Sequence, residues 1–524
     1  MNDKIQILIT MVLYMSIVIG IGVYFYKRAQ KSSENYFLGG RTLGPWVAAM
    51  SAEASDMSGW LLMGLPGVAY WCGLADAFWT AIGLAIGTYV NWLIVAKRLR
   101  NYSVISGNAI TIPDFFSNRF HEKKKIILGI SAVFILVFFT VYAASCFVAC
   151  GKLFSTLFGF DYHWMMIIGA VFVIAYTLIG GFLAESVSDF MQAIVMIGAL
   201  IIMVIVGVTN AGGFGAVIEN AKDIPGFFSL NYIAFPEVGE NGMQIVENGA
   251  PLFGPASSYG ILTMFSMLAW GLGYFGVPQV LLRFMAIRKP EEIKRSRRIA
   301  TVWVVISLSV AVFIGILGRY LMPINDVLLS KSGAENVFIE LATGYLPPII
   351  AGVIMAGILA ATISSSDSYL LIAASSVSKN IYEGIIKKDK KVDDKKVMWL
   401  SRIVLVVIAI IGMIIAWDEN SVIFSLVSFA WAGFGATFGP IMLFSLFWKR
   451  TTRQGAIAGM ISGAVSVFVW KMLLNPIGGI FGIYELLPAF IISCIAIVVA
   501  SLLSKEPSDE IKAEFENAKA GLNV

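Results

Sequence analysis

The feature that most limits how this chain can fold is a series of apolar runs, each about 20 residues long, separated by clusters of charge. A helix of about 20 residues crosses the roughly 30 Å of hydrocarbon in a bilayer. Lipid offers the backbone no hydrogen-bond partner, so each run is expected to be helical. Charged residues make up 14% of the chain, against about a quarter in soluble domains. The sequence therefore predicts an all-α, multi-pass membrane protein.

Thirteen runs can be placed along the chain, with boundaries good to a few residues. They lie near 5–26, 43–72, 75–99, 125–152, 162–184, 187–209, 257–280, 297–321, 345–378, 398–416, 421–447, 453–473 and 482–503. The first run is longer than the apolar part of a signal peptide, lacks a small-residue cleavage site and precedes Lys27 and Arg28. We therefore expect it to remain in the protein as a helix.

Basic residues gather in alternate loops, which indicates the orientation, because cytoplasmic segments accumulate Lys and Arg. With the N-terminus outside and the C-terminus in the cytoplasm, 32 of the 38 basic residues are cytoplasmic. The six that remain outside are Lys4, Lys152, Lys222, Arg319, Lys331 and Lys471. Arg283 and the basic loop after it are then cytoplasmic, where they shape an inner gate or contact phosphate or lipid. The lysine-rich segment 387–396 is interpreted as a solvated loop and not as a nucleic-acid site.

Residues for metal or redox chemistry are scarce. Four cysteines lie in apolar stretches without CxxC spacing, and two histidines, His121 and His163, are too few for a centre built on imidazole. No nucleophile and base stand at a recognisable spacing, so an enzyme is not expected.

Two spans carry similar clusters of Gly and Pro, SDMSGWLLMGLPG at 55–67 and LAWGLGYFGVP at 268–278. Such clusters free backbone carbonyls and amides at membrane depth, which is tolerated only beside a cavity or other protein. Close packing of small residues is the alternative reading for any single glycine. The clusters open the second and the seventh spans, so 43–209 and 257–447 are expected to form inverted repeats around a transport site.

The remaining segments follow from this division. They are 1–42 with the first span and a cytoplasmic loop, 210–256 as an extracellular loop with a short helix, 448–503 with two C-terminal spans, and 504–524 as a cytoplasmic tail.

Four acidic residues fall within or beside the spans, where an unpaired carboxylate costs several kcal/mol. Asp56 lies inside the first Gly-rich cluster, with Glu53 one turn before it; Asp189 begins the sixth span and Asp367 lies in the ninth. Interfacial solvation is an alternative explanation for Asp189 and Glu185. Ser364, Ser365, Ser366 and Ser368 crowd the turn around Asp367. Their hydroxyls, with carbonyls freed near Asp56, would supply the neutral oxygens that a monovalent cation needs.

At these residues the chain resembles the sodium/solute symporter family, and within it the bacterial proline branch. The most specific segments are SAEASDMSGWLLMGLPG, YTLIGGFLAESVSDFMQ and AWGLGYFGVPQVLLRFMA. The resemblance implies thirteen helices in the five-plus-five inverted-repeat fold first recognised in a bacterial leucine transporter. It also implies a bacterial inner membrane, sodium-coupled symport of L-proline and alternating access; the oligomeric state stays open.

Carried over by position, the resemblance implies a sodium site made of the Ala54, Met57 and Ala361 carbonyls and the Ser364 and Ser365 hydroxyls. Asp56 and Asp189 match acids that the family needs for ion coupling. The implied substrate residues are Ser58, Gly59, Trp60, Tyr142, Trp270, Tyr274 and Pro278. An apolar aromatic box suits a pyrrolidine ring, and freed amides suit its carboxylate.

Two residues depart from the proline branch, because Glu53 and Asp367 stand where uncharged residues are expected. Asp367, Ser368 and Asp189 could hold a second ion. Two other functions stay open: a sodium symporter for another amino acid, pantothenate, choline or a monocarboxylate, and a membrane sensor that binds a solute without carrying it.

Overall fold

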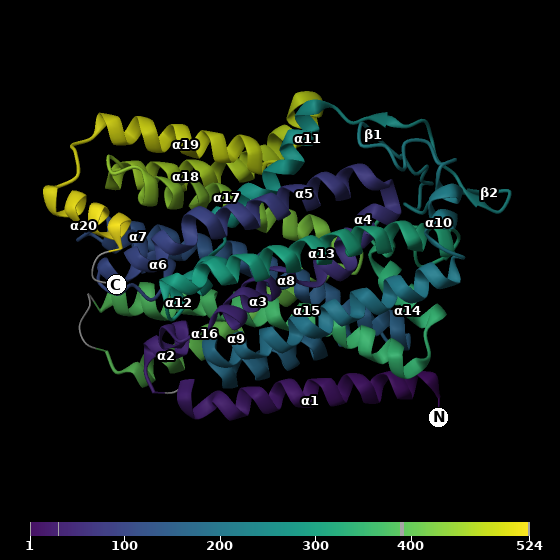
Figure 1. Ribbon diagram of the computed structural model, residues 1–524, viewed down its shortest axis with the longest axis horizontal. Coiled ribbons are helices and arrows are strands. Elements are labelled where there is room, and N and C mark those ends of the chain that lie inside the picture. Colours follow the sequence, from purple (N-terminus) through teal and green to yellow (C-terminus); the bar gives the residue numbers. More distant parts are fainter. Residues whose placement is uncertain (1, 30, 388–391, 522–524) are drawn as a thin grey trace.

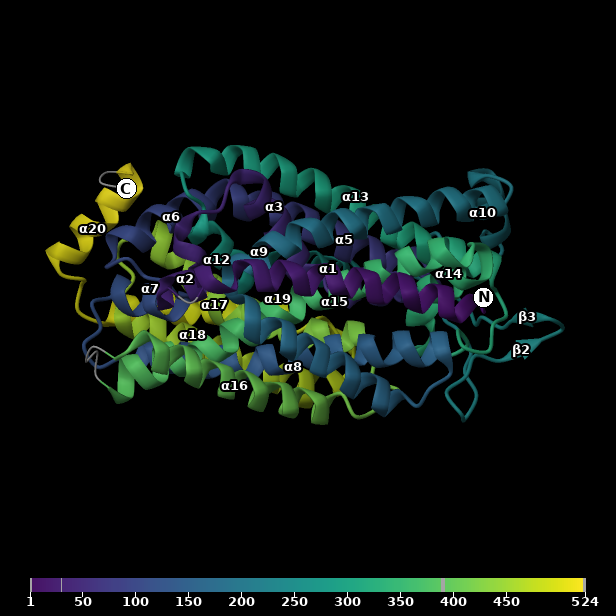
Figure 2. The same cartoon turned by 90° about the horizontal axis from the view of Figure 1, so that it is seen from below.

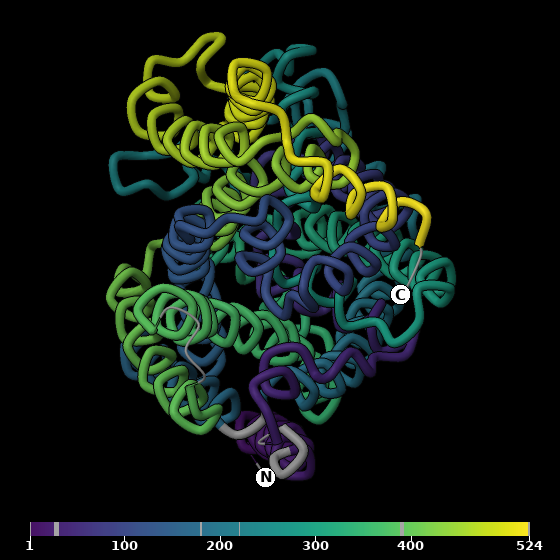
Figure 3. Tube along the Cα trace, turned by 90° about the vertical axis from the view of Figure 1, so that its left-hand side faces the viewer, coloured from purple at the N-terminus to yellow at the C-terminus, as the bar shows by residue number. Residues whose placement is uncertain are grey.

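A computed structural model describes residues 2–29, 31–387 and 392–521, and helices dominate it. The long helices run side by side along the longest axis of the molecule (Figure 1), and a second view shows the same alignment (Figure 2). The two chain ends lie at opposite ends of this axis, which we call the N-terminal and C-terminal ends of the molecule. Viewed along the axis, α1 (Asp3–Ala29) lies at the edge of the bundle (Figure 3).

The helices of the first part of the chain are α2 (Ser33–Leu38), α3 (Pro45–Asp56), α4 (Leu65–Cys72), α5 (Leu74–Val90), α6 (Ala96–Ile105), α7 (Ile112–Arg119), α8 (Ile126–Phe158) and α9 (Tyr162–Asn210). Shorter turns join them: the 3-10 turn η1 (Gly39–Arg41) and the π-helical turns η2 (Trp60–Gly64) and η3 (Asn91–Val95).

The helices of the second part are α10 (Phe214–Ala221), α11 (Ile261–Leu268), α12 (Pro278–Ala286), α13 (Ile293–Leu321), α14 (Val337–Tyr345), α15 (Pro348–Ser375), α16 (Asp394–Ile415), α17 (Ile423–Phe447), α18 (Arg453–Val469), α19 (Leu486–Leu503) and α20 (Asp509–Ala520). The short turns are η4 (Ala269–Phe275), η5 (Pro290–Glu292), η6 (Gly333–Asn336), η7 (Ser376–Ile386), η8 (Trp470–Leu474), η9 (Asn475–Ile477) and η10 (Gly479–Phe481). The lysine-rich loop expected at 387–396 falls partly on 388–391, outside the described residues.

Among the described residues, ten helices are long and apolar enough to cross a membrane, or eleven when the bent pair spanning 261–286 counts as one. The prediction of an all-α, multi-pass protein is confirmed, but the helices do not establish thirteen spans. The expected span 43–72 divides into α3 and the shorter apolar helix Trp60–Cys72, and the expected span 162–184 contains the shorter apolar helix Tyr162–Leu178. Both are short because the helix breaks there, after Asp56 in the first case and at Gly181, with φ 62° and ψ 176°, in the second.

The first break interrupts the second expected span. Helix α3 ends at Asp56 because Met57, with φ −82° and ψ 74°, leaves the helical region. The chain resumes as the π-helical turn η2 and then α4. Gly59 lies against α8, where an added Cβ would stand 2.8 Å from the Cβ of Ala149. A glycine is therefore required for this close approach.

The second break separates α11 and η4 from α12, with a bend of 42°. Val277 has an extended backbone, and Pro278 begins α12 at the first helical position, where its missing N–H costs nothing. Gly276 lies against α17, because a Cβ added there would be 2.3 Å from the Phe434 carbonyl oxygen. Glycine and proline thus break the seventh expected span as the sequence predicted.

Two pairs of short strands lie at the N-terminal end of the molecule. Strand β1 (Tyr232–Ile233) pairs with β4 (Ser257–Ser258), and β2 (Val246–Glu247) with β3 (Ala250–Pro251). Figures 1 and 2 place this segment at the N-terminal end. The expected loop 210–256 thus contains α10, as predicted, together with strands that the sequence did not suggest.

Helix α17 is anchored at its first turn by Glu335. The Glu335 carboxylate accepts hydrogen bonds from the Ile423 and Phe424 amides, both at 2.9 Å, and pairs with Lys152 Nζ at 2.8 Å. A carboxylate at a helix N-terminus satisfies free amides and complements the helix dipole. Further along, α17 contains Pro440 in its interior.

Helix α20 lies at the C-terminal end, where Phe515 packs against Tyr102 with ring centroids 6.4 Å apart.

We expect Gly276→Ala to lower the thermal unfolding temperature of the purified protein in detergent, because the new methyl group meets the Phe434 backbone. Overpacking of this kind costs about 1–3 kcal/mol. The control is Gly260→Ala, since a Cβ at Gly260 meets nothing within 4 Å. Equal unfolding temperatures for the two variants, measured by intrinsic fluorescence, would contradict the close contact.

Candidate functional site

The first break faces the serine-rich turn of α15. Ser364 Oγ donates to the Ala54 carbonyl oxygen at 2.8 Å, and Ser365 Oγ donates to the same oxygen at 3.2 Å. Ser364 Oγ is also 3.2 Å from the Ala361 carbonyl oxygen. The structure thus brings together four of the five residues expected to bind sodium. The fifth, Met57, lies at the start of the break, three residues after Ala54.

Asp56, the last residue of α3, joins the two broken spans. Its Oδ2 atom accepts a hydrogen bond of 2.7 Å from the hydroxyl of Tyr274 in η4. Its carbonyl oxygen accepts one of 3.1 Å from Trp60 Nε1. The carboxylate is fully buried, so this hydroxyl lowers the cost of keeping it away from water. Each broken segment therefore holds the other in place.

Several buried polar atoms near this junction have no hydrogen-bond partner among the described residues. They are Asp56 Oδ1, Ser58 Oγ, Tyr142 Oη, Trp270 Nε1 and Tyr369 Oη. Most buried polar atoms in proteins are paired, so these five atoms are available to a polar ligand or to water. Four of the five belong to residues that the sequence analysis assigned to the substrate site or to ion coupling.

Aromatic rings enclose the same region. The Trp60 and Trp270 rings lie 6.2 Å apart, and Tyr274 meets Trp431 edge-on at 5.0 Å. Tyr142 of α8 stacks on Tyr369 of α15 at 4.2 Å. Gly59, between Trp60 and Ser58, contacts α8 and α15. The last expected residue, Pro278, lies at the start of α12, beyond these rings.

Four aromatic residues that line this region escaped the sequence analysis: Tyr369, Phe424, Trp431 and Tyr484. Trp270 stacks on Tyr484 at 5.1 Å and lies 5.3 Å from Phe424, while its carbonyl accepts a hydrogen bond of 2.8 Å from Trp431 Nε1. Tyr369 follows directly after the serine-rich turn, which was an available signal. The others carry no local pattern that separates them from ordinary membrane aromatics.

A cavity of about 720 Å³ connects this aromatic group to the N-terminal end. Trp270, Phe424 and Tyr484 line its inner part, and residues 233–236 of the strand-bearing loop line its outer part. Lys331 and Glu335 add charge to the wall. A small solute can therefore approach the aromatic rings from the N-terminal end of the molecule.

The opposite side of the site is closed by a buried charge network around Arg283. This guanidinium contacts Glu185, lies 3.1 Å from Asp189 Oδ2 and donates to Ser368 Oγ at 2.8 Å and to Ser51 Oγ at 3.0 Å. Ser51 Oγ in turn donates to Asp189 at 2.7 Å. The network joins α3, α9, α12 and α15 just beyond the Ser364 turn.

Two expectations need correction here. Arg283 is fully buried, so its side chain contacts neither lipid nor a soluble phosphate. Glu185 and Asp189 are buried too, so pairing with Arg283 explains them, whereas interfacial solvation does not. Both acidic residues follow the kink at Gly181 in α9 and lie against Arg283 of α12. Of the residues expected to form a second ion site, Asp189 and Ser368 bind Arg283; Asp367 accepts a hydrogen bond from the Ser368 amide.

Main-chain contacts seal the C-terminal end further. The Leu43 amide donates to the Ala286 carbonyl at 3.1 Å, and the Arg288 amide donates to the Leu43 carbonyl at 3.0 Å. Arg41 donates to the Met285 carbonyl at 2.7 Å. These bonds tie the chain before α3 to the chain after α12. The other departure noted in the sequence, Glu53, accepts a hydrogen bond of 3.2 Å from Trp92 Nε1.

Comparison with known proteins shows the family to which the chain belongs. The profile of the sodium:solute symporter family matches residues 36–463. The chain belongs to the sodium:solute symporter family. It is 40% identical over 518 residues to sodium/proline symporters of Staphylococcus aureus strains USA300 and COL, covering 98% of this chain and 96% of the relative. Sodium is therefore the coupling ion of this family member, and the protein is a transporter of the membrane.

Solved structures support the fold of this symporter. A Na⁺-coupled sialic acid symporter in a substrate-bound, outward-open state aligns with a TM-score of 0.74 at 18% identity, covering 96% of this chain and 99% of that one. Mhp1, a nucleobase-cation-symport-1 family transporter, aligns with a TM-score of 0.53 at 12% identity, covering 94% and 100%. At these identities the likeness concerns the fold alone.

We expect Arg283→Gln to destabilise this symporter, because it leaves two buried carboxylates without their counter-charge. Breaking a buried ion pair costs about 3–5 kcal/mol. Arg288→Gln is the matched control, since Arg288 pairs with Glu292 at the exposed surface and should change stability little. Unfolding temperatures measured in detergent test this, and a normal temperature for Arg283→Gln would contradict the network.

Proposed function

We propose that this chain carries L-proline into the cell together with sodium by alternating access. The observation that supports this most is the contact of the Ser364 and Ser365 hydroxyls with the Ala54 carbonyl at a broken span. The relatives of 40% identity are named sodium/proline symporters, and they match the chain over nearly all of its length. An isolated fold likeness would not suggest a substrate, whereas this match does.

The proposed architecture has thirteen spans, counting the short helices around 60–72 and 162–178 as spans. Residues 43–209 and 257–447 are the two inverted repeats, each opening with a broken span. Residues 448–503 add two spans, 1–42 add the first, 210–256 form the external loop and 504–524 the tail. The N-terminus lies outside and the C-terminus in the cytoplasm of the bacterial inner membrane. The excess of basic residues on one side and the opposite positions of the two chain ends support this orientation.

Sodium binds, in this proposal, to the carbonyls of Ala54, Met57 and Ala361 and the hydroxyls of Ser364 and Ser365. These are neutral oxygens, which suit a monovalent cation that has to be released again in every cycle. The two hydroxyls donate to the Ala54 carbonyl oxygen. Each can rotate so that its lone pairs meet a cation while the carbonyl oxygen stays in place. Asp56 lies two residues further and adds a negative charge near the ion.

Proline would lie among Trp60, Trp270, Tyr274 and Tyr142, beside the unpaired polar atoms. Its ring packs on aromatic faces, and its ammonium group is attracted by ring faces and by Asp56. Its carboxylate accepts hydrogen bonds from donors at the break, with Ser58 and Gly59 nearest, while Pro278 opens the second half-helix toward the site. Enclosure by Trp431 and Tyr369 completes the pocket.

Binding is coupled to the break, because the same segment carries Ala54, Asp56 and Ser58. A cation that fixes Ala54 therefore fixes the residues that meet proline. Release to the cytoplasm requires separation of α3 and α12 from α9 and α15, so the Arg283 network has to open. Asp189 acts there as an ion-coupling acid. A second cation at Asp189, Asp367 and Ser368 would have to compete with the Arg283 guanidinium for the same oxygens.

The driving force is sufficient for accumulation. A tenfold sodium gradient contributes about 1.4 kcal/mol and a potential of 100 mV about 2.3 kcal/mol per charge. One sodium ion per proline therefore supports a concentration ratio of several hundred.

The substrate is tested by radiolabelled proline uptake in proteoliposomes with an imposed sodium gradient. We expect uptake that stops when choline replaces sodium, and competition by unlabelled proline but not by pantothenate, choline or a monocarboxylate. If one of these solutes or another amino acid competed more strongly than unlabelled proline, that solute and not proline would be the substrate. Binding of proline without uptake would support a sensor.

The sodium site is tested with Ser364→Ala. Loss of one hydroxyl should raise the sodium concentration for half-maximal uptake about tenfold, since one hydrogen-bond-sized contribution is about 1–1.5 kcal/mol. Ser366→Ala is the matched control, because among the described residues Ser366 donates only to carbonyls of its own helix. Asp56→Asn should abolish coupled uptake. Equal sodium dependence in the two serine variants would remove Ser364 from the site.

A further inference from the structure

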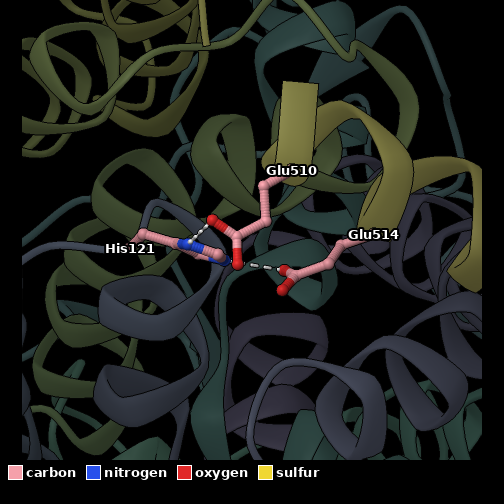
Figure 4. A group of neighbouring side chains, drawn as sticks. All are labelled: His121, Glu510 and Glu514. Carbon is pink, nitrogen blue, oxygen red and sulfur yellow. Dashed lines mark ion pairs between the residues drawn. The ribbon is translucent and has the colours of Figure 1, made fainter. Parts of the chain in front are cut away.

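One cluster of ligand-type side chains lies outside the transport site, at the C-terminal end of the molecule. His121 belongs to the loop between α7 and α8, and Glu510 and Glu514 belong to α20 (Figure 4). Their ligand atoms, one imidazole nitrogen and one oxygen from each carboxylate, all lie within 4.8 Å of one another. Figure 4 shows the imidazole edge turned toward both carboxylates.

The two glutamates bring like charges close together. They stand four residues apart on α20 and so share one face, where like charges destabilise a helix by about 0.2–0.5 kcal/mol. Glu514 Oε2 is shielded from solvent and accepts no hydrogen bond from the described residues. It lies 2.9 Å from His121 Nε2, and Glu510 Oε2 lies 3.7 Å from His121 Nδ1. A cation placed between these atoms would neutralise both carboxylates at once.

The imidazole is held in place by its own backbone. His121 has φ 46°, in the left-handed region that few residues other than glycine adopt. Its amide donates to the Asn118 carbonyl at 3.0 Å, and the Glu122 amide donates to the Ser117 carbonyl at 3.0 Å. These two hydrogen bonds fix the backbone that carries the imidazole.

We propose that His121, Glu510 and Glu514 bind a divalent transition-metal cation, with zinc the best match, and that this ion fastens α20 to the loop between α7 and α8. Zinc takes imidazole nitrogen at 2.0–2.1 Å and carboxylate oxygen at 2.0–2.2 Å, and water completes four ligands. The Glu510 side chain is 75% exposed, so it can turn toward an ion held by the other two. The proposed site needs one imidazole and two carboxylates, so it differs from the imidazole-based centre that the sequence analysis did not expect.

The proposed site opens to a hollow and lies near residues that bind Arg41. A hollow of about 740 Å³ beside His121 is lined by Ser106, Gly107 and Glu514, and also by Lys123 and Lys125. The wall at 106–107 adjoins Asn108 and Ala109, whose oxygens bind Arg41 at 3.1 and 2.7 Å. Arg41 in turn holds the Met285 carbonyl after α12. An ion that fixes α20 therefore stiffens the segment that closes the C-terminal side of the transport site.

Zinc binding is measured on the full-length protein in detergent by competition with a chromophoric chelator. We expect one zinc per chain, with affinity about tenfold or more weaker in His121→Ala and Glu514→Gln. The matched control is His163→Ala, which removes the other histidine, paired with Asp161 at 3.6 Å, and should leave binding unchanged. Cobalt should give the visible bands of a nitrogen and oxygen site in the wild type and not in His121→Ala. Sodium-driven uptake by each variant shows that it is folded.

A second measurement concerns α20 itself. Zinc should slow proteolysis in the segment 504–508, which precedes α20, in the wild type and in His163→Ala but not in His121→Ala. The proposal would be overturned if the wild type bound no more zinc than His121→Ala does. It would also be overturned if His163→Ala lost as much zinc binding as His121→Ala. Protection that follows pH alike with zinc or with chelator would also overturn it, because a protonated imidazole then suffices.

Discussion

The hydrogen bonds from Ser364 and Ser365 to the Ala54 carbonyl are the contact on which the rest of this transporter depends. A chain that leaves its helix inside a membrane exposes main-chain groups that lipid cannot satisfy. Here the serine-rich turn of α15 donates hydrogen bonds to the Ala54 carbonyl. Tyr274 donates to the Asp56 carboxylate, and Trp60 donates to the Asp56 carbonyl. The break is therefore stabilised by the groups that a cation and a solute would engage, so stability and binding draw on the same atoms.

The two sides of this break are unequal. Toward the N-terminal end a cavity reaches Trp270, Phe424 and Tyr484, whereas toward the C-terminal end the Arg283 network and main-chain hydrogen bonds join the helices. The Arg283 guanidinium is held by five partners: Ser51, Glu185, Asp189, Ser368 and the Gln279 carbonyl. Opening the charged side thus requires the loss of several bonds together, which favours a two-state change. This asymmetry suits a protein that receives solute from one side first.

Much of the site could be predicted from the sequence, because its rules are local. Gly and Pro at 59, 276 and 278 identified both breaks, and a run of serines identified the facing turn. What escaped prediction depends on tertiary structure. In the sequence, Arg283 resembles part of a basic loop, yet it lies in α12 and pairs with Glu185 and Asp189 of α9. Trp431 and Tyr484 resemble ordinary membrane aromatics until α17 and the segment before α19 are placed. The number of spans was uncertain for the same reason, since glycine breaks shorten two helices.

Helix α17 illustrates how one proline shapes movement. Its first turn is fixed by Glu335, and Trp431 within it is bonded to the Trp270 carbonyl. Pro440 donates no hydrogen bond, so the ladder is interrupted opposite Ala436, whose carbonyl lies so close to Gly463 of α18 that a Cβ there would be 2.1 Å from it. The missing hydrogen bond lowers the resistance of the helix to bending at that point. A bend there would leave the part of α17 held by Glu335 and Trp270 in place and change the direction of the part after Pro440.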